Sequence, residues 1–199
     1  PHKWLYSPLE AGCCLVKDQS LLTDAFSFHP VYYNFDGGEE HTTNFHESGM
    51  QNSRGFRALK VWLSLQQAGS EGYISMIRED IRLAKLLFDL LPEYPELERF
   101  SHHLSITTFR YKPLDIAPDE SNKDYLNRLN QALLNKLQAG GEVFPSNTVI
   151  DGNFVLRVCV VNFRTTMKEI AALPDIVIRE GNLLHKQMRD EQPVKGLTR

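Results

Sequence analysis

The chain has 199 residues, of which 42% are hydrophobic and 24% are charged, and 22 Lys and Arg against 25 Asp and Glu give a formal net charge of -3. These values are typical of a globular protein and argue against a disordered tail, a collagen-like repeat or a membrane bundle. No block of Lys or Arg marks a surface for nucleic acid or for an anionic membrane. The three cysteines, two of them adjacent, cannot form a fully paired disulfide framework, which favours a reducing compartment, the cytoplasm.

The first quarter of the chain combines short apolar runs with one long irregular stretch. Residues 11–17 are small and apolar and predict a buried strand, in which Cys13 and Cys14 are small buried side chains. Residues 20–26 predict one or two helical turns. Residues 29–54 show neither a helical nor an alternating period. A loop of that length is uncommon in a compact domain unless it is functional or disordered, so it is the first indication of a site.

Two helices are predicted next. The first covers residues 56–68 and ends at Gly69, a residue suited to the position after a helix. The second begins at Ser70, and its apolar residues recur at steps of three and four, so that one stripe faces a core and charged side chains stay in solvent. Pro92 and Pro95 end it, because proline cannot continue a helix.

Past Pro95 the pattern becomes that of a small α+β layer. Residues 104–111, 143–149 and 154–161 have the composition of strands. The last two are joined by a turn at Asp151-Gly152-Asn153. We therefore expect an antiparallel sheet with helices on one face.

The helices of this layer carry their own start signals. The run from Ser121 to Asp124 is interpreted as a capping box, and the helix that follows it ends at Gly140-Gly141. The run from Thr166 to Glu169 opens a last helix, which Pro174 is expected to kink or restart. The tail after Gln187 is expected to be poorly ordered.

Near the N-terminus, Lys3 lies between His2 and Trp4, just ahead of the predicted buried strand. In apolar surroundings an ammonium loses hydration, so that its pKa falls and the neutral amine can attack a carbonyl. A Schiff base with pyridoxal phosphate requires that reactivity. The alternative is a terminal lysine with no chemical role.

Further candidates lie at the two ends of the irregular stretch. Tyr32 and Tyr33 stand near its start, and a phenol on a closing loop can deliver a proton to a carbanion. Ser53 stands at its end, where a hydroxyl and the first N–H groups of a helix suit an anionic phosphate. The alternatives are tyrosines packed on their own scaffold and a serine that only caps a helix.

Taken together, these features resemble the C-terminal part of the group II pyridoxal-phosphate-dependent amino-acid decarboxylases, the family of the aromatic-amino-acid, histidine and glutamate decarboxylases. Tyr32 follows Lys3 by 32 − 3 = 29 positions, as in the aromatic members. The resemblance extends to about Gln187. It rests on four motifs, which are Pro1-His2-Lys3-Trp4, His29-Pro30-Val31-Tyr32, Ser53-Arg54 and Phe56-Arg57-Ala58-Leu59-Lys60-Val61-Trp62.

The resemblance implies an α/β fold with an α+β part, the C-terminal portion of a fold-type I enzyme. Residues 1–92 would then be the end of the large cofactor domain, with a mobile catalytic loop at 29–54 and linking helices. Residues 93–187 would form the small C-terminal α+β domain with its antiparallel sheet, and residues 188–199 a disordered tail.

The resemblance also implies roles for individual residues. Lys3 would hold the cofactor, pyridoxal 5'-phosphate, as an internal aldimine, with His2 near the cofactor phosphate. Tyr32 would reach into the neighbouring subunit and reprotonate the carbanion. Ser53 would approach the phosphate and substrate pocket of the partner subunit. The implied activity is the decarboxylation of a small L-amino acid to an amine by a homodimer.

In this family the groups that stack on the pyridine ring and bind most of the phosphate lie upstream of the lysine. The chain is therefore expected to be inactive without the N-terminal half of the same enzyme. One alternative is a non-catalytic fragment that acts as a structural or dimerisation half. Another is a metal-dependent hydrolase, although its candidate ligands lack a recognised metal-binding spacing; these are His29, His41, His46, His102, His103, Glu39, Glu40 and Glu47.

Overall fold

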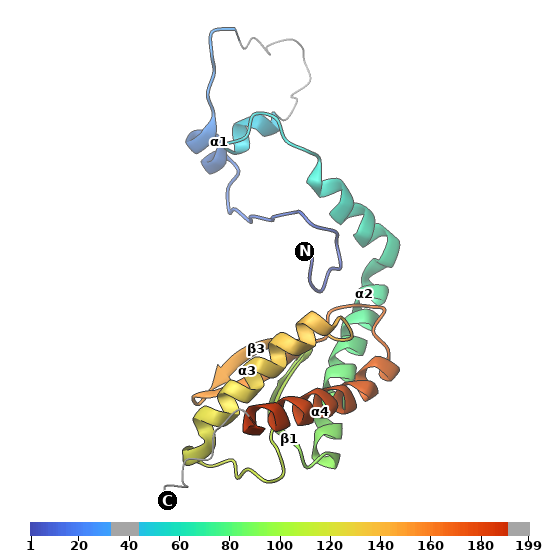
Figure 1. The fold of residues 1–199 in the computed structure, drawn as a ribbon. Helices are drawn as coiled ribbons and strands as arrows, with labels where there is room; N and C mark the ends of the chain where they lie inside the picture. The colour runs from blue at the N-terminus through green and yellow to red at the C-terminus, as the bar shows by residue number, and fades with distance from the viewer. Residues whose placement is uncertain (33–43, 191–199) are drawn as a thin grey trace, which may run out of the picture. The chain divides into compact units, whose positions relative to one another are not determined.

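The computed structural model describes residues 1–32 and 44–190, and it divides the chain into two compact units, Pro1–Ala68 and Gly69–Arg199 (Figure 1). Helix α2, Arg57–Leu90, crosses this division, and at Gly69 its backbone is non-helical, with φ of 64° and ψ of 178°. Glycine adopts a positive φ without the steric cost that a Cβ atom brings. The predicted break between two helices at Gly69 is therefore confirmed.

The described part of the first unit contains little regular structure. Its elements are α1 (Ser20–Phe26), the short 3-10 helix η1 (Phe45–Ser48) and the start of α2. The helical turns predicted at residues 20–26 are confirmed.

The buried strand predicted at residues 11–17 is wrong. These residues form no strand, and Cys13 and Cys14 are exposed free thiols. An apolar run shows that a segment favours burial, but a strand also needs a neighbour that pairs with its N–H and C=O groups. The described residues of this unit contain no such neighbour.

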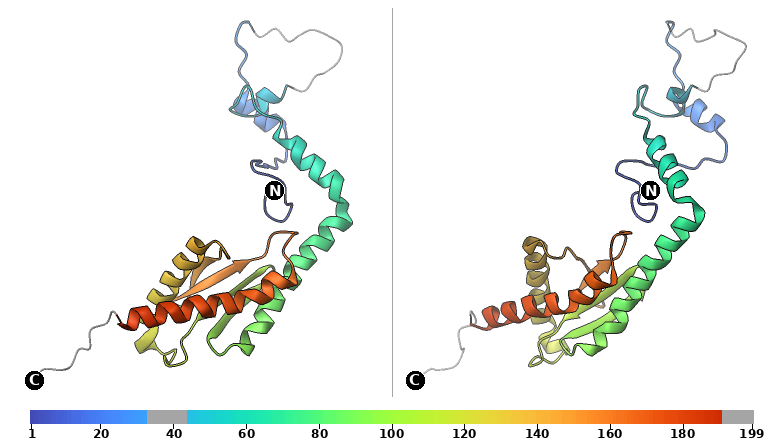
Figure 2. Two further views of the ribbon diagram at one scale, coloured as in Figure 1. Left: turned by 45° about the vertical axis from the view of Figure 1, so that its right-hand side comes forward. Right: turned by 90° about the vertical axis from the view of Figure 1, so that its right-hand side faces the viewer.

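The second unit is built on a four-stranded antiparallel sheet, in the order β1-β2-β4-β3 (Figure 2). The predicted antiparallel sheet is therefore confirmed, as is the turn between its last two strands, where Asp151 and Gly152 have positive φ angles. The strands are β1 (Leu97–His103), β2 (Ile106–Tyr111), β3 (Ser146–Ile150) and β4 (Asn153–Cys159).

Among the strands of the described residues, β1 is the one that the sequence pattern did not predict. The strand predicted at 104–111 instead begins at Ile106, because Leu104, with φ of 51°, lies in the turn between β1 and β2. The pairing of β1 with β2 shifts register between Arg99 and Ser101, which marks a β-bulge. A bulge interrupts the alternation of side chains, and so it hides the period by which a strand is recognised.

Helices α3 (Lys123–Gly140) and α4 (Met167–Asp190) lie side by side over the sheet (Figure 1). The capping box predicted at Ser121–Asp124 is wrong. The carboxylate of Asp119 accepts the Asn122 N–H at 3.1 Å, so the acidic cap lies earlier and starts the short 3-10 helix η3, Glu120–Asn122. This turn leads directly into α3.

The helix start predicted at residues 166–169 is confirmed, and a capping box forms there. The Thr166 N–H donates to the Glu169 carboxylate at 2.8 Å, and the Lys168 N–H donates to the Thr166 hydroxyl at 3.3 Å. The helix does not restart at Pro174, because α4 continues through it to Asp190. The first residues of the expected tail are thus helical, and residues 191–199 lie outside the described part of the chain.

The core of the second unit lies between the helices and one face of the sheet. Thr107, Phe109 and Tyr111 alternate along β2 and are fully buried on this face. The Thr107 hydroxyl donates to the Ala84 carbonyl of α2 at 2.6 Å. The amide of Asn130, on α3, bonds both the N–H and the C=O of Tyr111 at 2.8 Å. Helices α2 and α3 are thereby tied to the same strand.

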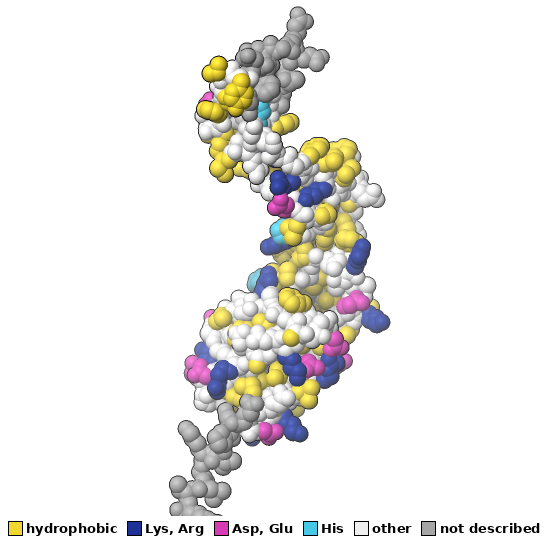
Figure 3. Space-filling model, turned by 45° about the horizontal axis from the view of Figure 1, so that its top comes forward, with side chains coloured by type: hydrophobic (Ala, Val, Ile, Leu, Met, Phe, Trp, Pro, Cys, Tyr) yellow, Lys and Arg dark blue, Asp and Glu magenta, His cyan; other side chains and the backbone are white. Residues whose placement is uncertain are grey.

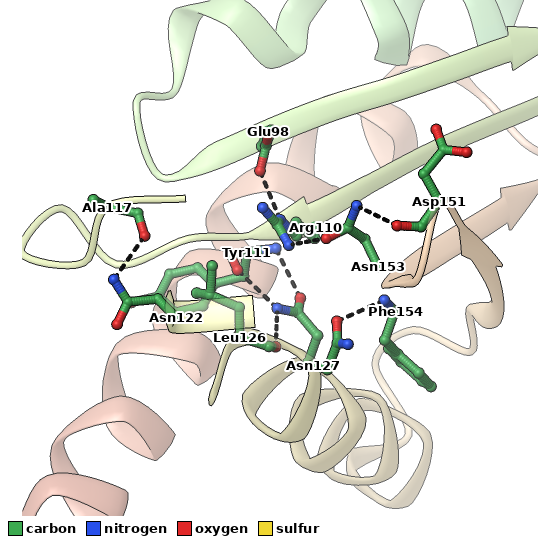
Figure 4. A network of polar contacts seen from close by, with 11 residues as sticks. Glu98, Arg110, Tyr111, Ala117, Asn122, Leu126, Asn127, Asp151, Asn153 and Phe154 are labelled. Carbon is green, nitrogen blue, oxygen red and sulfur yellow. Dashed lines mark hydrogen bonds and ion pairs between the residues drawn. The ribbon is translucent and has the colours of Figure 1, made fainter. Parts of the chain in front are cut away.

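A buried arginine links three strands on the sheet (Figure 4). The side chain of Arg110 is only 4% exposed; its Nε donates to Glu98 at 2.6 Å and its Nη1 to Asn153 at 2.9 Å. A buried charge is tolerated when it is paired and hydrogen-bonded. Arg110 on β2 thus joins β1, through Glu98, to β4, through Asn153.

The packing of Tyr111 against α4 leads to a stability prediction. A Cβ atom at Gly181 would lie 2.7 Å from Cγ of the Tyr111 ring. We expect Gly181→Ala to lower the free energy of unfolding by about 1–3 kcal/mol, because both the ring and the helix backbone are held in the core. Urea denaturation of the chain would measure this change. Gly140→Ala, where a Cβ meets nothing within 4 Å, is the control and should not destabilise.

Candidate functional site

The residues around Lys3 form a tight turn. The Tyr6 N–H donates to the Lys3 carbonyl at 2.8 Å, and the Ser7 N–H donates to the Pro1 carbonyl at 3.2 Å. Tyr6 has a φ of 47°, which reverses the chain direction after Lys3. The Lys3 side chain is exposed, so the described residues of this chain do not supply the apolar surroundings that the sequence predicted for its amine.

An open hollow of about 1290 Å³ lies in the first unit. It is bordered by three stretches that are distant in sequence: the segment after Lys3, the short helix η1, and the start of α2 with the residues before it. Its polar side chains include an imidazole, a hydroxyl, a carboxylate and two guanidinium groups. These belong to His2, Ser53, Glu10, Arg54 and Arg57.

The hollow brings together two of the four residues that the sequence singled out. His2 and Ser53, which are 51 positions apart, both line it. Lys3 and Tyr32 are not among its lining residues, and Tyr32 is 78% exposed. Lys3 is the direct neighbour of His2, so its amine is carried by the same turn.

An ion pair crosses the hollow from the N-terminal segment to α2. Nε and Nη2 of Arg57 donate to one carboxylate oxygen of Glu10, at 2.9 and 2.6 Å. The hydrogen bond from Arg57, the positive charge of Arg57 and that of Lys60 lower the pKa of Glu10. The carboxylate is therefore held in its charged form by the start of α2. The sequence analysis missed this pair, because two residues 47 positions apart leave no local pattern.

Two further side chains tie the other segments of the first unit together. Nη2 of Arg54 donates to the Phe45 carbonyl of η1 at 2.7 Å. Nε2 of His29 lies 2.8 Å from a carboxylate oxygen of Glu47, also on η1. The segment that carries Tyr32 and the segment that carries Ser53 are thus both attached to η1.

The metal-dependent alternative finds no support in the described residues. Among residues 1–32 and 44–190, no group of three or more His, Cys, Asp or Glu side chains is arranged to hold a metal ion. His29 is paired with Glu47 instead. Of the remaining candidate ligands, Glu39, Glu40 and His41 lie outside the described residues.

The described residues also contain no helix that is both long and apolar enough to cross a membrane.

Comparison with known proteins identifies the class. The model of the pyridoxal-dependent decarboxylase conserved domain matches residues 1–112. The chain is 34% identical to an aromatic-L-amino-acid decarboxylase of Bacillus atrophaeus over 172 residues, 85% of this chain and 35% of that protein. It is 31% identical to a phenylacetaldehyde synthase of Arabidopsis thaliana over 188 residues, 93% of this chain and 37% of that protein.

A solved structure shows the same fold. The crystal structure of Oryza sativa TDC with PLP and tryptamine matches with a TM-score of 0.69 and 22% identity, covering 85% of this chain and 35% of that one. The predicted fold class, an α/β and α+β portion of a fold-type I enzyme, is therefore confirmed.

Since the family model covers more than half of the chain, the chain belongs to the pyridoxal-dependent decarboxylases, as the resemblance indicated. The family takes its name from its cofactor, so the cofactor predicted from the resemblance, pyridoxal 5'-phosphate, is also confirmed. The chain spans about a third of the length of the curated relatives that it matches.

Proposed function

We propose that this chain is part of a pyridoxal-phosphate-dependent L-amino-acid decarboxylase, which releases CO₂ and forms an amine. The observation that carries the proposal is the family match over residues 1–112, the range that contains every sequence-predicted site residue. The aromatic-amino-acid decarboxylase among the similar proteins supports an aromatic amino acid as the substrate.

The side chains of the first unit have the chemistry that the cofactor requires. An exposed primary amine at Lys3 suits an aldehyde, and the Ser53 hydroxyl with the Arg54 guanidinium suits a phosphate. The hollow holds two guanidinium groups and one carboxylate, so its formal charge favours an anion. When bound, pyridoxal phosphate supplies a ring system that accepts the electron pair left by departing CO₂.

In this proposal each residue of the chain has a separate task. The Lys3 amine binds the cofactor covalently, and His2 lies near the cofactor phosphate. Ser53 contributes a hydroxyl to the phosphate and substrate pocket of a partner subunit. The Tyr32 hydroxyl donates a proton to Cα of the substrate once CO₂ has left. The Tyr32 side chain is 78% exposed.

The whole enzyme requires more than this chain. We propose that the N-terminal half of the same enzyme supplies the remaining cofactor contacts, and that residues 1–92 complete its large domain, with residues 93–187 as the small domain. The active form is a cytoplasmic homodimer, in which Tyr32 and Ser53 act across the interface.

A structural role without catalysis is the second candidate. The surface of α2 between residues 57 and 68 carries exposed apolar side chains, and Figure 3 shows hydrophobic atoms gathered along this stretch. Leu59, Trp62 and Leu63 are 40%, 56% and 51% exposed. Apolar patches of this kind mark association surfaces. A fragment with only this role would associate with other chains but would not bind the cofactor at Lys3.

The role of Lys3 predicts covalent capture of the cofactor. The protein expressed from its whole coding sequence, incubated with pyridoxal phosphate and reduced with borohydride, should carry the pyridoxyl group on Lys3. Lys3→Ala should abolish the label, because it removes the amine to which the proposal assigns the cofactor. Peptide mass spectrometry measures the label. Lys17→Ala, which removes another exposed lysine, is the matched control and should keep it.

The role of Tyr32 predicts a loss of product formation with little loss of binding. Tyr32→Phe should lower amine formation by roughly 10²–10⁴-fold, the usual contribution of a general acid, while cofactor capture stays unchanged. The assay should measure CO₂, amine and aldehyde, since an aldehyde synthase is among the similar proteins. Tyr94→Phe, in the second unit, serves as the control. Full turnover in Tyr32→Phe would remove Tyr32 from the reaction.

A further inference from the structure

We propose that the ion pair between Glu10 and Arg57 is a positioning contact, which holds the turn with His2 and Lys3 beside the segment that carries Ser53 and leads into α2. The proposal rests on the proposed function for the roles of Lys3 and Ser53. It adds two residues that make no contact with the reacting atoms but fix where the binding groups lie.

The geometry supports a link between two segments. Both Nε and Nη2 of Arg57 donate to one oxygen of Glu10, so the guanidinium is restrained in direction as well as in distance. Arg57 is the first residue of α2, and its own N–H donates to the Gly55 carbonyl at 2.7 Å. The pair therefore joins the segment after Lys3 to a backbone turn that directly follows Ser53.

No helix or strand fixes the position of the N-terminal segment. Residues 1–18 form no helix and no strand. Among these residues only Ser7 is buried, and its hydroxyl has no hydrogen-bond partner in the described part of the chain. A segment that lies outside any helix or sheet is positioned by its turns and by individual side-chain contacts.

The charges of the hollow explain why the contact is an ion pair. An unpaired carboxylate at Glu10 would repel an anionic phosphate or substrate carboxylate. When Glu10 is paired with Arg57, their charges cancel, and the guanidinium of Arg54 gives the hollow a net positive charge. The two side chains are 74% and 41% exposed, so the pair adds little to global stability. Its effect is expected in local geometry.

Hydrogen exchange of the apo chain tests the positioning directly. Glu10→Gln and Arg57→Gln should each speed exchange of the hydrogen-bonded Tyr6 and Ser7 amides by about two- to fivefold, the modest effect expected of an exposed pair, with the unfolding midpoint unchanged. The charge-swapped double variant, Glu10→Arg with Arg57→Glu, should restore slow exchange. Glu79→Gln is the matched control, because it breaks another exposed pair in which Nε and Nη2 of an arginine donate to a carboxylate, that of Arg82 in the second unit, and it should leave this segment unchanged.

Borohydride capture of pyridoxal phosphate on Lys3, in the protein from its whole coding sequence, separates positioning from simple electrostatics. Positioning predicts that both single variants slow capture and that the swap restores it. If the pair acted only through its charge, Glu10→Gln would speed capture and Arg57→Gln would slow it, which would overturn the proposal. Unchanged exchange in both single variants would also overturn it. Failure of the wild-type protein to capture the cofactor would reject the proposed function, while the exchange result would still decide the role of the pair.

Discussion

The two units of the chain differ in how much apolar surface they bury, and this difference determines which of them has a core of its own. Every buried hydrophobic side chain in residues 1–32 and 44–190 lies at or beyond Tyr73. The second unit therefore has its own core, in which helices α2, α3 and α4 pack on one face of the sheet. The described residues before Tyr73 instead expose large apolar side chains, such as Leu15, Phe28 and Trp62. Because apolar burial is the main driving force for folding, the first unit is the part of the chain that gains most from a partner.

The predicted site residues all belong to that first unit. Without a core or a sheet, their segments are joined by side chains that reach across the chain: Glu10 to Arg57, Arg54 to Phe45, and His29 to Glu47. These contacts are polar and largely exposed, and such contacts define direction better than they supply stability. Geometry at the site is thus set by local contacts.

The sequence predicted helices and strands well where the spacing of apolar residues was regular. It failed where the structure depended on a pairing partner or where a bulge interrupted that spacing. The stripe from Ile74 to Leu91 gave the second part of α2, and Gly69 gave its boundary. Strand β1 escaped notice because its bulge and polar residues break the alternation. The strand predicted at 11–17 was wrong because apolar composition indicates a preference for burial but does not show which segment would cover or pair with the run. At the site, His2 and Ser53 followed from family motifs, but the Glu10–Arg57 pair depends on a contact that only the folded chain reveals.

The two edge strands of the sheet, β1 and β3, affect how readily copies of this unit aggregate. An edge strand has unpaired N–H and C=O groups, and a strand of another molecule can pair with them, which is the first step toward fibrils. Here β1 carries the irregularity between Arg99 and Ser101, and β3 is only five residues long. One edge strand is distorted by a bulge and the other is short, so neither offers a long, regular edge for pairing with another chain. The sheet is therefore protected against edge-to-edge aggregation.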